Sequence, residues 1–194
     1  MNKNIVLCGV GGQGTVLASK LIASAAMKKD IPVMSAETIG MAQRGGSVFS
    51  HIRMGDGLYT PMIAKGSADI IIGFEPGETV RMLPYLKVDG QVIVSRRTIM
   101  PVTATLSDTP YDGGEMIAYL KAHTHKLLVV DTEQACREIG SARVLNLLLL
   151  GAAVQSGALG LDEEDLKTAI RERVPEKFHE LNFRALSYMK EHSI

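Results

Sequence analysis

Residues 5–14 place the strongest constraint on the fold of this chain. They read Ile-Val-Leu-Cys-Gly-Val-Gly-Gly-Gln-Gly, an apolar run that ends in four glycines, and residues 15–28 continue as a helical pattern. A strand, a tight turn and a helix in this order open an α/β fold. Gly9, Gly11 and Gly14 fit the pattern G-x-G-x-x-G, in which glycines permit a sharp turn, close approach of a ligand and packing of the helix on the strand.

The same turn is a natural seat for an anion. Gly12 makes the turn almost free of side chains, so Gln13 supplies the one polar side chain at its tip. Unpaired N–H groups and the helix dipole both favour an anion at the start of the following helix. A glycine turn also opens many α/β folds that bind no dinucleotide, so a purely architectural role stays open.

The composition argues against several classes of function. The 194 residues include 21 basic and 21 acidic side chains, so no net charge attracts nucleic acid or an anionic membrane. Neutrality mildly favours a protein that lives with partners. Cys8 and Cys136 are too few for a disulfide framework or a four-thiolate iron–sulfur cluster. The sequence shows no signal peptide or membrane-spanning run, and we expect a cytoplasmic location.

Several strands are expected after the first helix. Residues 32–35 should form a second strand and complete a right-handed βαβ unit with the first. Residues 47–54 alternate as a strand, residues 55–57 turn, and residues 58–62 return, which predicts an antiparallel hairpin. Three further parallel strands are predicted from the apolar runs 69–73, 91–95 and 127–130.

The rest of the chain is predicted to be helical. Helices are expected from residue 75 to about 86 and over 115–122. Ser141, Asp162 and Pro175 should begin three more helices. The predicted fold class is α/β: a Rossmann-like, mostly parallel sheet with an antiparallel hairpin at its edge and a C-terminal helical clasp, in a single domain over residues 1–194.

Glu37 supports one functional hypothesis. If it closes the second strand, it lies 23 positions after Gly14, near where a Rossmann fold places the acid that holds a ribose. This favours a free-standing NAD(P)-binding oxidoreductase. Against it, residues 38–46 form a loop with three glycines instead of a helix, and a standard mononucleotide-binding half would not break there.

Residues 44–47 form a second candidate ligand loop. Gly45 and Gly46 offer backbone donors, Arg44 offers a rigid fork for a carboxylate or phosphate, and Ser47 adds a hydroxyl. Such a loop can seat an anionic ligand. The alternative is that Arg44 pairs with Glu37 and that the glycines merely permit close packing.

Other side chains favour structural explanations. A lone strand histidine such as His51 is more often structural or at an interface than catalytic. His123 and His125 have no nearby carboxylate or thiol pair and make a poor metal site. Cys8 lies in the first strand with no base beside it in sequence, so we do not expect a nucleophile.

The two loops together resemble a family signature. Gly9-Val-Gly-Gly-Gln-Gly14, followed by the run from Glu37 through Met-Ala-Gln-Arg-Gly-Gly-Ser to Arg53, is similar to the gamma subunits of 2-oxoacid:ferredoxin oxidoreductases. Within that family the Met41–Ser47 sequence is most similar to the beta subunits of indolepyruvate ferredoxin oxidoreductases. The resemblance extends over nearly the whole chain. The residues carried over by position are Gly9, Gly11, Gly12, Gln13, Gly14, Glu37, Thr38, Arg44, Gly45, Gly46 and Ser47.

The resemblance implies a heteromeric enzyme that decarboxylates a 2-oxoacid, attaches the acyl group to coenzyme A and passes two electrons to ferredoxin. It implies that thiamine diphosphate, Mg and iron–sulfur clusters sit on partner subunits, while this chain holds no cofactor firmly and shares coenzyme A as a possible ligand. We expect a homodimer when the chain is isolated. A binding or regulatory module that kept the fold and lost the partners is a third hypothesis.

Overall fold

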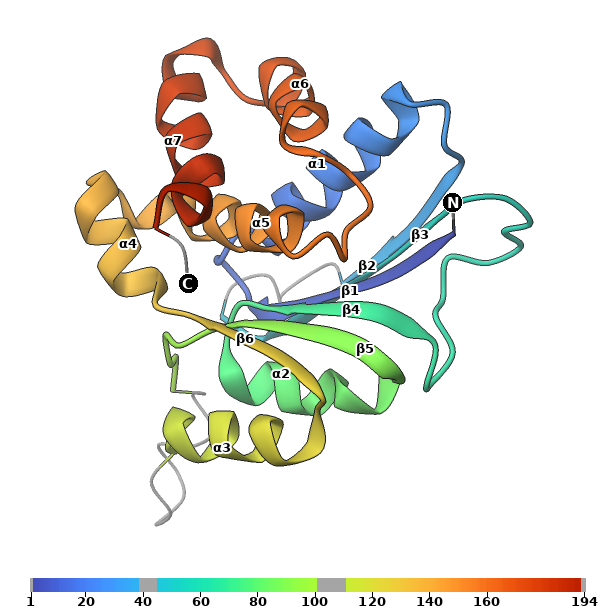
Figure 1. Ribbon diagram of the computed structural model, residues 1–194, viewed down its shortest axis with the longest axis vertical. Helices are drawn as coiled ribbons and strands as arrows, with labels where there is room; N and C mark the ends of the chain where they lie inside the picture. The colour runs from blue at the N-terminus through green and yellow to red at the C-terminus, as the bar shows by residue number, and fades with distance from the viewer. Residues whose placement is uncertain (1, 39–44, 101–110, 193–194) are drawn as a thin grey trace.

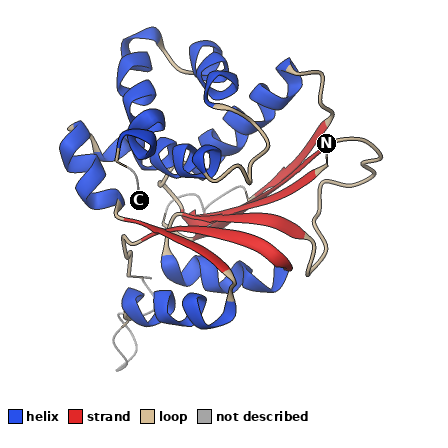
Figure 2. Cartoon of the chain, in the orientation of Figure 1, coloured by secondary structure: helices blue, strands red, loops and turns tan. Residues whose placement is uncertain are grey.

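The computed structural model describes residues 2–38, 45–100 and 111–192 (Figure 1). Within these ranges, a six-stranded sheet in the order β2-β3-β1-β4-β5-β6 lies between two layers of helices (Figures 1 and 2). The strands are β1 (Lys3–Val10), β2 (Val33–Glu37), β3 (Ser47–Met54), β4 (Ala68–Gly73), β5 (Leu86–Ser95) and β6 (Lys126–Val130). The α-helices are α1 (Thr15–Lys28), α2 (Pro76–Met82), α3 (Gly113–His123), α4 (Thr132–Ile139), α5 (Leu145–Gln155), α6 (Glu163–Arg173) and α7 (His179–Glu191). Short 3-10 turns are η2 (Leu83–Tyr85), η4 (Ala142–Val144) and η5 (Glu176–Phe178).

The predicted fold class is confirmed, with one change in the order of strands. Strands β1, β4, β5 and β6 are parallel neighbours, as the apolar runs predicted. Strand β3 is antiparallel to both β1 and β2 and lies between them. The expected βαβ unit of β1, α1 and β2 therefore exists, but its two strands are not adjacent.

The hairpin at the sheet edge is formed by β2 and β3, and the predicted partner strand over residues 58–62 is wrong. Those residues form a loop instead, because side chains of β3 bind its backbone. Arg53 Nη1 donates to the carbonyl oxygen of Thr60 at 3.0 Å, and the amide N–H of Ile63 donates to His51 Nδ1 at 3.0 Å. The loop thus lies against the face of β3 and does not extend the sheet.

The two faces of the sheet bury two apolar clusters. Helices α1, α4, α5, α6 and α7 cover one face, and α2 with α3 covers the other (Figure 2). Side chains alternate between the faces, so Ile5 and Leu7 of β1 enter the larger cluster while Val6 and Cys8 enter the smaller one. No helix within the described ranges has both the length and the apolar content needed to cross a membrane.

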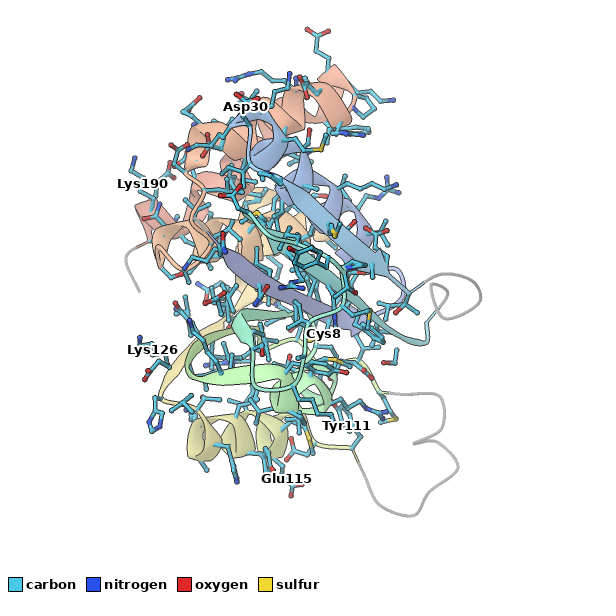
Figure 3. The ribbon with its side chains drawn as sticks, turned by 90° about the vertical axis from the view of Figure 1, so that its right-hand side faces the viewer. Cys8, Asp30, Tyr111, Glu115, Lys126 and Lys190 are labelled. Atoms are coloured by element: carbon cyan, nitrogen blue, oxygen red, sulfur yellow. The ribbon has the colours of Figure 1, made fainter. Side chains whose placement is uncertain are left out.

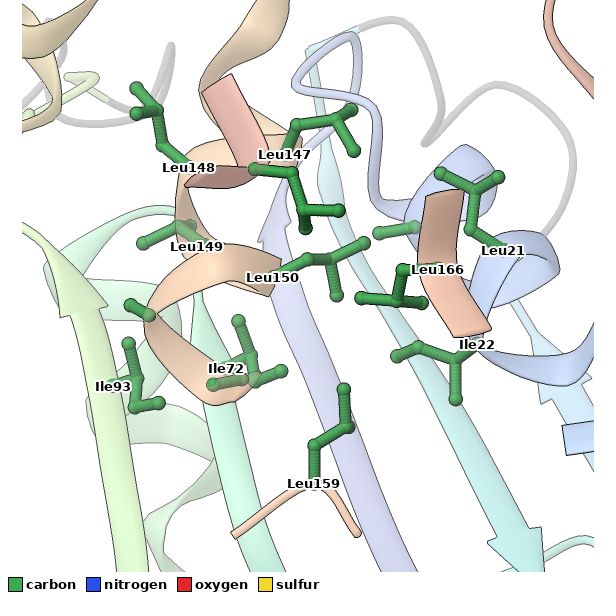
Figure 4. Packing of buried hydrophobic residues seen from close by; sticks show 14 of the residues in the cluster. Leu21, Ile22, Ile72, Ile93, Leu147, Leu148, Leu149, Leu150, Leu159 and Leu166 are labelled. Atoms are coloured by element: carbon green, nitrogen blue, oxygen red, sulfur yellow. The ribbon is translucent and has the colours of Figure 1, made fainter. Parts of the chain in front are cut away.

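Helix α5 is the centre of the larger cluster. It runs between the sheet and α7, and it packs against both. For this reason Leu147, Leu148, Leu149 and Leu150 are all fully buried although they point in different directions (Figure 4). A helix that is apolar on every side is expected to be buried on every side.

Of the three predicted helix starts, only Asp162 directly begins an α-helix, whereas Ser141 and Pro175 precede the 3-10 turns η4 and η5. Asp162 caps α6 with the predicted partner, Asp165, in a reciprocal capping box. Ser141 caps the 3-10 turn η4, which continues into α5. Helix α4 was not predicted, although Asp131 caps it by accepting from the amide of Gln134.

We expect Gly151→Ala to destabilise the fold. A Cβ at residue 151 would lie 2.2 Å from the backbone carbonyl oxygen of Leu186, so α5 and α7 would have to separate. Overpacking of this kind costs about 1–3 kcal/mol. Gly114→Ala is the matched control, since the nearest atom there is a flexible Asp112 oxygen at 3.1 Å. Urea denaturation of both variants measures the difference, and equal stabilities would contradict the packing role of Gly151.

Candidate functional site

The candidate site lies where β1 and β4 end. These strands are parallel neighbours, yet α1 follows β1 on one face of the sheet and α2 follows β4 on the other. In open α/β sheets, this change of side creates the crevice in which ligands bind, beyond the carboxyl ends of the strands. The glycine turn of residues 9–14 lies at this position.

The glycine turn exposes backbone donors. Gly12 and Gly14 have φ angles of 101° and 87°, which favour glycine over other residues. The amide N–H groups of Gly12, Gly14, Thr15, Val16 and Leu17 have no backbone acceptor among the described residues. A pocket of about 290 Å³ lies here, and its lining includes Val48 of β3. A pocket of this kind at a helix start suits an anion.

Asn146 of α5 lies beneath the turn. A Cβ at Gly14 would come within 3.0 Å of its Nδ2 atom, so the glycine is needed for close packing as well as for its φ angle. The Asn146 side chain is 2% exposed, and its Oδ1 has no hydrogen-bond partner among the described residues. Buried polar atoms are normally paired, so this oxygen indicates a site that a water or a ligand completes.

Gln13 does not point out from the tip of the turn as the sequence suggested. Its Oε1 accepts from the amide of Val10 at 2.7 Å, and its Nε2 donates to the carbonyl oxygen of Phe74 at 2.8 Å. Gly9 makes room for it, since a Cβ there would lie 2.7 Å from Gln13 Oε1. The side chain therefore ties β1 to the end of β4.

The second glycine loop meets the first, as predicted. The amide N–H of Gly11 donates to the carbonyl oxygen of Gly46 at 2.8 Å. Gly45 has a φ angle of 95°, and Ser47 begins β3. Arg44, the predicted anion fork, lies outside the described residues.

Glu37 and Thr38 lie farther from the turn than a Rossmann fold would place them. Glu37 is opposite Ser50, which is itself opposite Leu7, so β3 separates the acid from β1. Two strand spacings correspond to about 10 Å. Thr38 is used in the sheet, since its hydroxyl donates to the carbonyl oxygen of Phe49 and accepts from the Phe49 amide, both at 3.0 Å. This arrangement removes the geometric basis for a ribose contact by Glu37.

Sequence reasoning missed a buried polar cluster on the α2 side of the site. Glu75 and Glu78 are 2% and 5% exposed. Tyr111 donates to Glu75 Oε1 at 2.5 Å and accepts from the amide of Gly77 at 2.9 Å. Ser47 donates to Glu78 Oε2 at 2.5 Å. Figure 3 shows Tyr111 beside α2. The one sequence signal for the cluster was the two acids of the segment Glu75-Pro-Gly-Glu78, which directly follows a buried strand.

Burial changes the acidity of this cluster. Desolvation raises the pKa of Glu75, although hydrogen bonds from Tyr111 and from the amides of Glu78 and Ile99 oppose the effect. Desolvation and the neighbouring Glu75 carboxylate raise the pKa of Tyr111. Its hydroxyl therefore keeps its proton at neutral pH and acts as a donor to Glu75.

The side chains of Cys8 and His51, which lie near the site, are buried and inaccessible to a ligand. Cys8 is fully buried inside the sheet (Figure 3), and desolvation raises the pKa of its thiol, which disfavours the thiolate. His51 is also fully buried, with its ring against Phe49 and Tyr85, and desolvation lowers its pKa. The structural explanation for His51 is supported. Among the described residues, no group of three or more potential metal ligands occurs.

A second pocket lies beside the first turn of α1. It has a volume of about 440 Å³ and is walled by apolar side chains that include Leu17, Val144 and Phe178. Arg143 and Arg173 give the same pocket a cationic lining. Pockets of this size hold small organic ligands. Because Thr15 and Val16 line the glycine-turn pocket and Leu17 lines this one, the two pockets flank the same helix start.

Comparison with known proteins identifies the family. The family model described as pyruvate ferredoxin/flavodoxin oxidoreductase matches residues 4–189. The chain belongs to this oxidoreductase family. It is 38% identical over 186 residues to the indolepyruvate oxidoreductase subunit IorB of Methanothermobacter thermautotrophicus, covering 95% of this chain and 94% of that one. It is 28% identical to the common gamma subunit of the pyruvate/ketoisovalerate oxidoreductases of Thermococcus kodakarensis, covering 91% and 89%.

Solved structures of 2-oxoacid oxidoreductases share the fold. The pyruvate oxidoreductase subunit PORC of Thermotoga maritima superimposes with a TM-score of 0.70 at 22% identity, covering 98% of this chain and 96% of that one. The 2-oxoglutarate:ferredoxin oxidoreductase of Magnetococcus marinus gives a TM-score of 0.72 at 17% identity, covering 98% of this chain and 30% of that one. The family match and the IorB relatives show that the chain is a subunit of the 2-oxoacid ferredoxin oxidoreductase type, as the two loop motifs predicted.

The raised pKa of Glu75 predicts a pH dependence of stability for this oxidoreductase subunit. The folded state holds the proton to higher pH than the unfolded state, so the free energy of unfolding should fall as pH rises from about 4.5 through the folded pKa. Each tenfold difference in proton affinity is worth about 1.4 kcal/mol. Glu75→Gln should remove this decline, which denaturant titrations between pH 4 and 7 would measure. Glu115→Gln, at an exposed helix start, is the control. If the free energies of unfolding of the wild type and of Glu75→Gln differ by the same amount at every pH, the prediction is wrong.

Proposed function

We propose that this chain is the subunit without thiamine diphosphate and without clusters in an indolepyruvate or other arylpyruvate ferredoxin oxidoreductase. The whole enzyme decarboxylates the oxoacid, joins the acyl group to coenzyme A and passes two electrons to ferredoxin. The IorB relatives support the arylpyruvate branch, because their identity to this chain is higher than that of the pyruvate/ketoisovalerate gamma subunits.

One observation carries the proposal: the two glycine loops meet at the sheet edge and offer binding groups without reactive ones. The pocket at the turn is lined by glycines, Thr15, Val16 and Val48. The nearby Cys8 thiol is sealed in the sheet. A surface of this kind suits recognition of a ligand whose chemistry is done by groups from partner subunits, which hold the thiamine diphosphate, Mg and iron–sulfur clusters.

Coenzyme A is the ligand that we assign to this surface, shared with a partner. Its phosphates match the unpaired N–H groups at the start of α1, where the helix dipole adds a favourable field. Its adenine ring and ribose phosphate match the adjacent pocket with apolar walls and Arg143 and Arg173. Glycines 9, 11, 12, 14, 45 and 46 act here through their backbone.

Charge at residue 12 should control the affinity for coenzyme A in the assembled enzyme. Gly12→Asp and Gly12→Asn have the same shape and the same backbone strain, so their comparison isolates the charge. An added carboxylate near a phosphate should cost about 1–2 kcal/mol, and we expect Gly12→Asp to raise KM for coenzyme A roughly tenfold over Gly12→Asn at low salt, with kcat unchanged. Steady-state ferredoxin reduction measures both constants. Equal KM values in the two variants would contradict the binding of a phosphate at the glycine turn.

The state of assembly provides a second test. Apolar side chains that a partner would cover are exposed, among them Tyr59 at 93% and Met62 at 48%. We expect the isolated chain to turn over nothing and to form a homodimer, and the chain co-expressed with thiamine-binding and cluster-bearing subunits to join them and oxidise indolepyruvate faster than pyruvate. Light scattering and ferredoxin reduction check these outcomes. Activity of the isolated chain, or a failure to join such subunits, would overturn the proposal.

A further inference from the structure

Ser47 has its only proton committed to a buried acid. Its Oγ donates to Glu78 Oε2 at 2.5 Å, and Glu78 is 5% exposed while Ser47 itself is exposed. Glu78 is held in turn by Arg81, whose Nε lies 3.6 Å from Oε1. A serine hydroxyl has one donor and two lone pairs. With the donor used, the exposed oxygen can only accept a hydrogen bond from a ligand.

Tyr111 repeats the pattern on the same side of the site. Its hydroxyl donates to the Glu75 carboxylate, as Ser47 donates to Glu78. Tyr111 also accepts from the amide of Gly77, so its oxygen is already engaged, whereas the oxygen of Ser47 stays exposed as an acceptor. The start of α1 differs, since its free groups are N–H donors. The start of α1 therefore favours a ligand group that accepts hydrogen bonds, and the Ser47 oxygen near the start of α2 favours one that donates them.

Between the start of α1 and the start of α2, the surface is formed by glycines and carries almost no side chains. The Gly11 amide donates to the Gly46 carbonyl oxygen, and glycines also stand at 12 and 45. Val48 lines the pocket at the glycine turn, and its neighbour Ser47 points to the opposite, α2 face of the sheet. A ligand that lies across these glycines contacts donors at one end and an acceptor at the other.

We propose that Glu78 is a positioning residue that fixes Ser47 as a hydrogen-bond acceptor, so that the site selects an anion carrying an N–H or O–H donor along its length. The proposal rests on the proposed function and adds the direction of the bound molecule. In the proposed pose, the anionic group of the ligand lies at the start of α1. The ligand extends across the glycines, and its N–H or O–H group donates to Ser47. Coenzyme A meets this requirement through the amide N–H groups next to its phosphates, whereas pyrophosphate has the anion alone.

Two probes separate the parts of this inference. Binding of 4′-phosphopantetheine and of pyrophosphate to the full chain is followed by NMR of the amides of Gly12, Gly14 and Val16. We expect Ser47→Ala to weaken 4′-phosphopantetheine roughly three- to tenfold and to leave pyrophosphate unchanged. Ser47→Thr, which retains the hydroxyl, should restore the affinity. Ser35→Ala, at another exposed strand serine, is the control and should change neither probe.

Glu78→Ala tests the positioning role. It should produce the same selective loss as Ser47→Ala, and the double variant should be no weaker than the weaker single variant, because both changes remove one contact. Additive losses, an equal loss of pyrophosphate, or an unchanged affinity of Ser47→Ala for 4′-phosphopantetheine would each overturn the inference. If Glu78→Ala does not fold, the Ser47→Ala and Ser47→Thr pair decides alone. Wild-type chain that binds neither probe would instead count against the anion seat of the proposed function.

Discussion

The carboxamide of Gln13 determines where a ligand can bind in this fold. Its hydrogen bonds to the Val10 amide and the Phe74 carbonyl oxygen join the ends of β1 and β4. That space is the crevice in which doubly wound sheets take their ligands, and here the protein fills it with its own side chain. Gly9 is part of the same device, because any Cβ there would collide with Gln13 and Phe74. The candidate pocket therefore lies toward β3, where the second glycine loop meets the turn.

Much of the fold could be predicted because it follows from local patterns. The spacing of apolar residues located α1 and β4, and Asp162 with Asp165 marked the start of α6. The place of β3 could not be predicted in this way, since alternation identifies a strand without naming its neighbours. Its insertion between β1 and β2 depends on pairing across the whole length of β1.

The features of the candidate site that depend on local sequence could also be predicted, and those that depend on tertiary packing could not. Its two glycine loops were predicted, because unusual backbone conformations require glycine whatever the surroundings. The roles of Gln13 and Thr38 were not, since both side chains bind backbone groups of other strands. The cluster at α2 was also missed, because the burial of Glu75 depends on Tyr111, a residue 36 positions away. A sequence shows an acid, but only the packing shows that it is buried.

The site gains a direction from these buried acids. An anion near the start of α2 would lie beside the acceptor oxygens of the buried Glu75 and Glu78 side chains, whereas an anion near the start of α1 would lie beside free N–H groups. A ligand with one charged end therefore has one favourable orientation at the edge of the sheet. Cys8 and His51 are buried beneath this edge, so a molecule bound as we propose would contact neither the Cys8 thiol nor the His51 ring. The proposed role, binding and orienting a ligand for a partner subunit, requires such a fixed orientation.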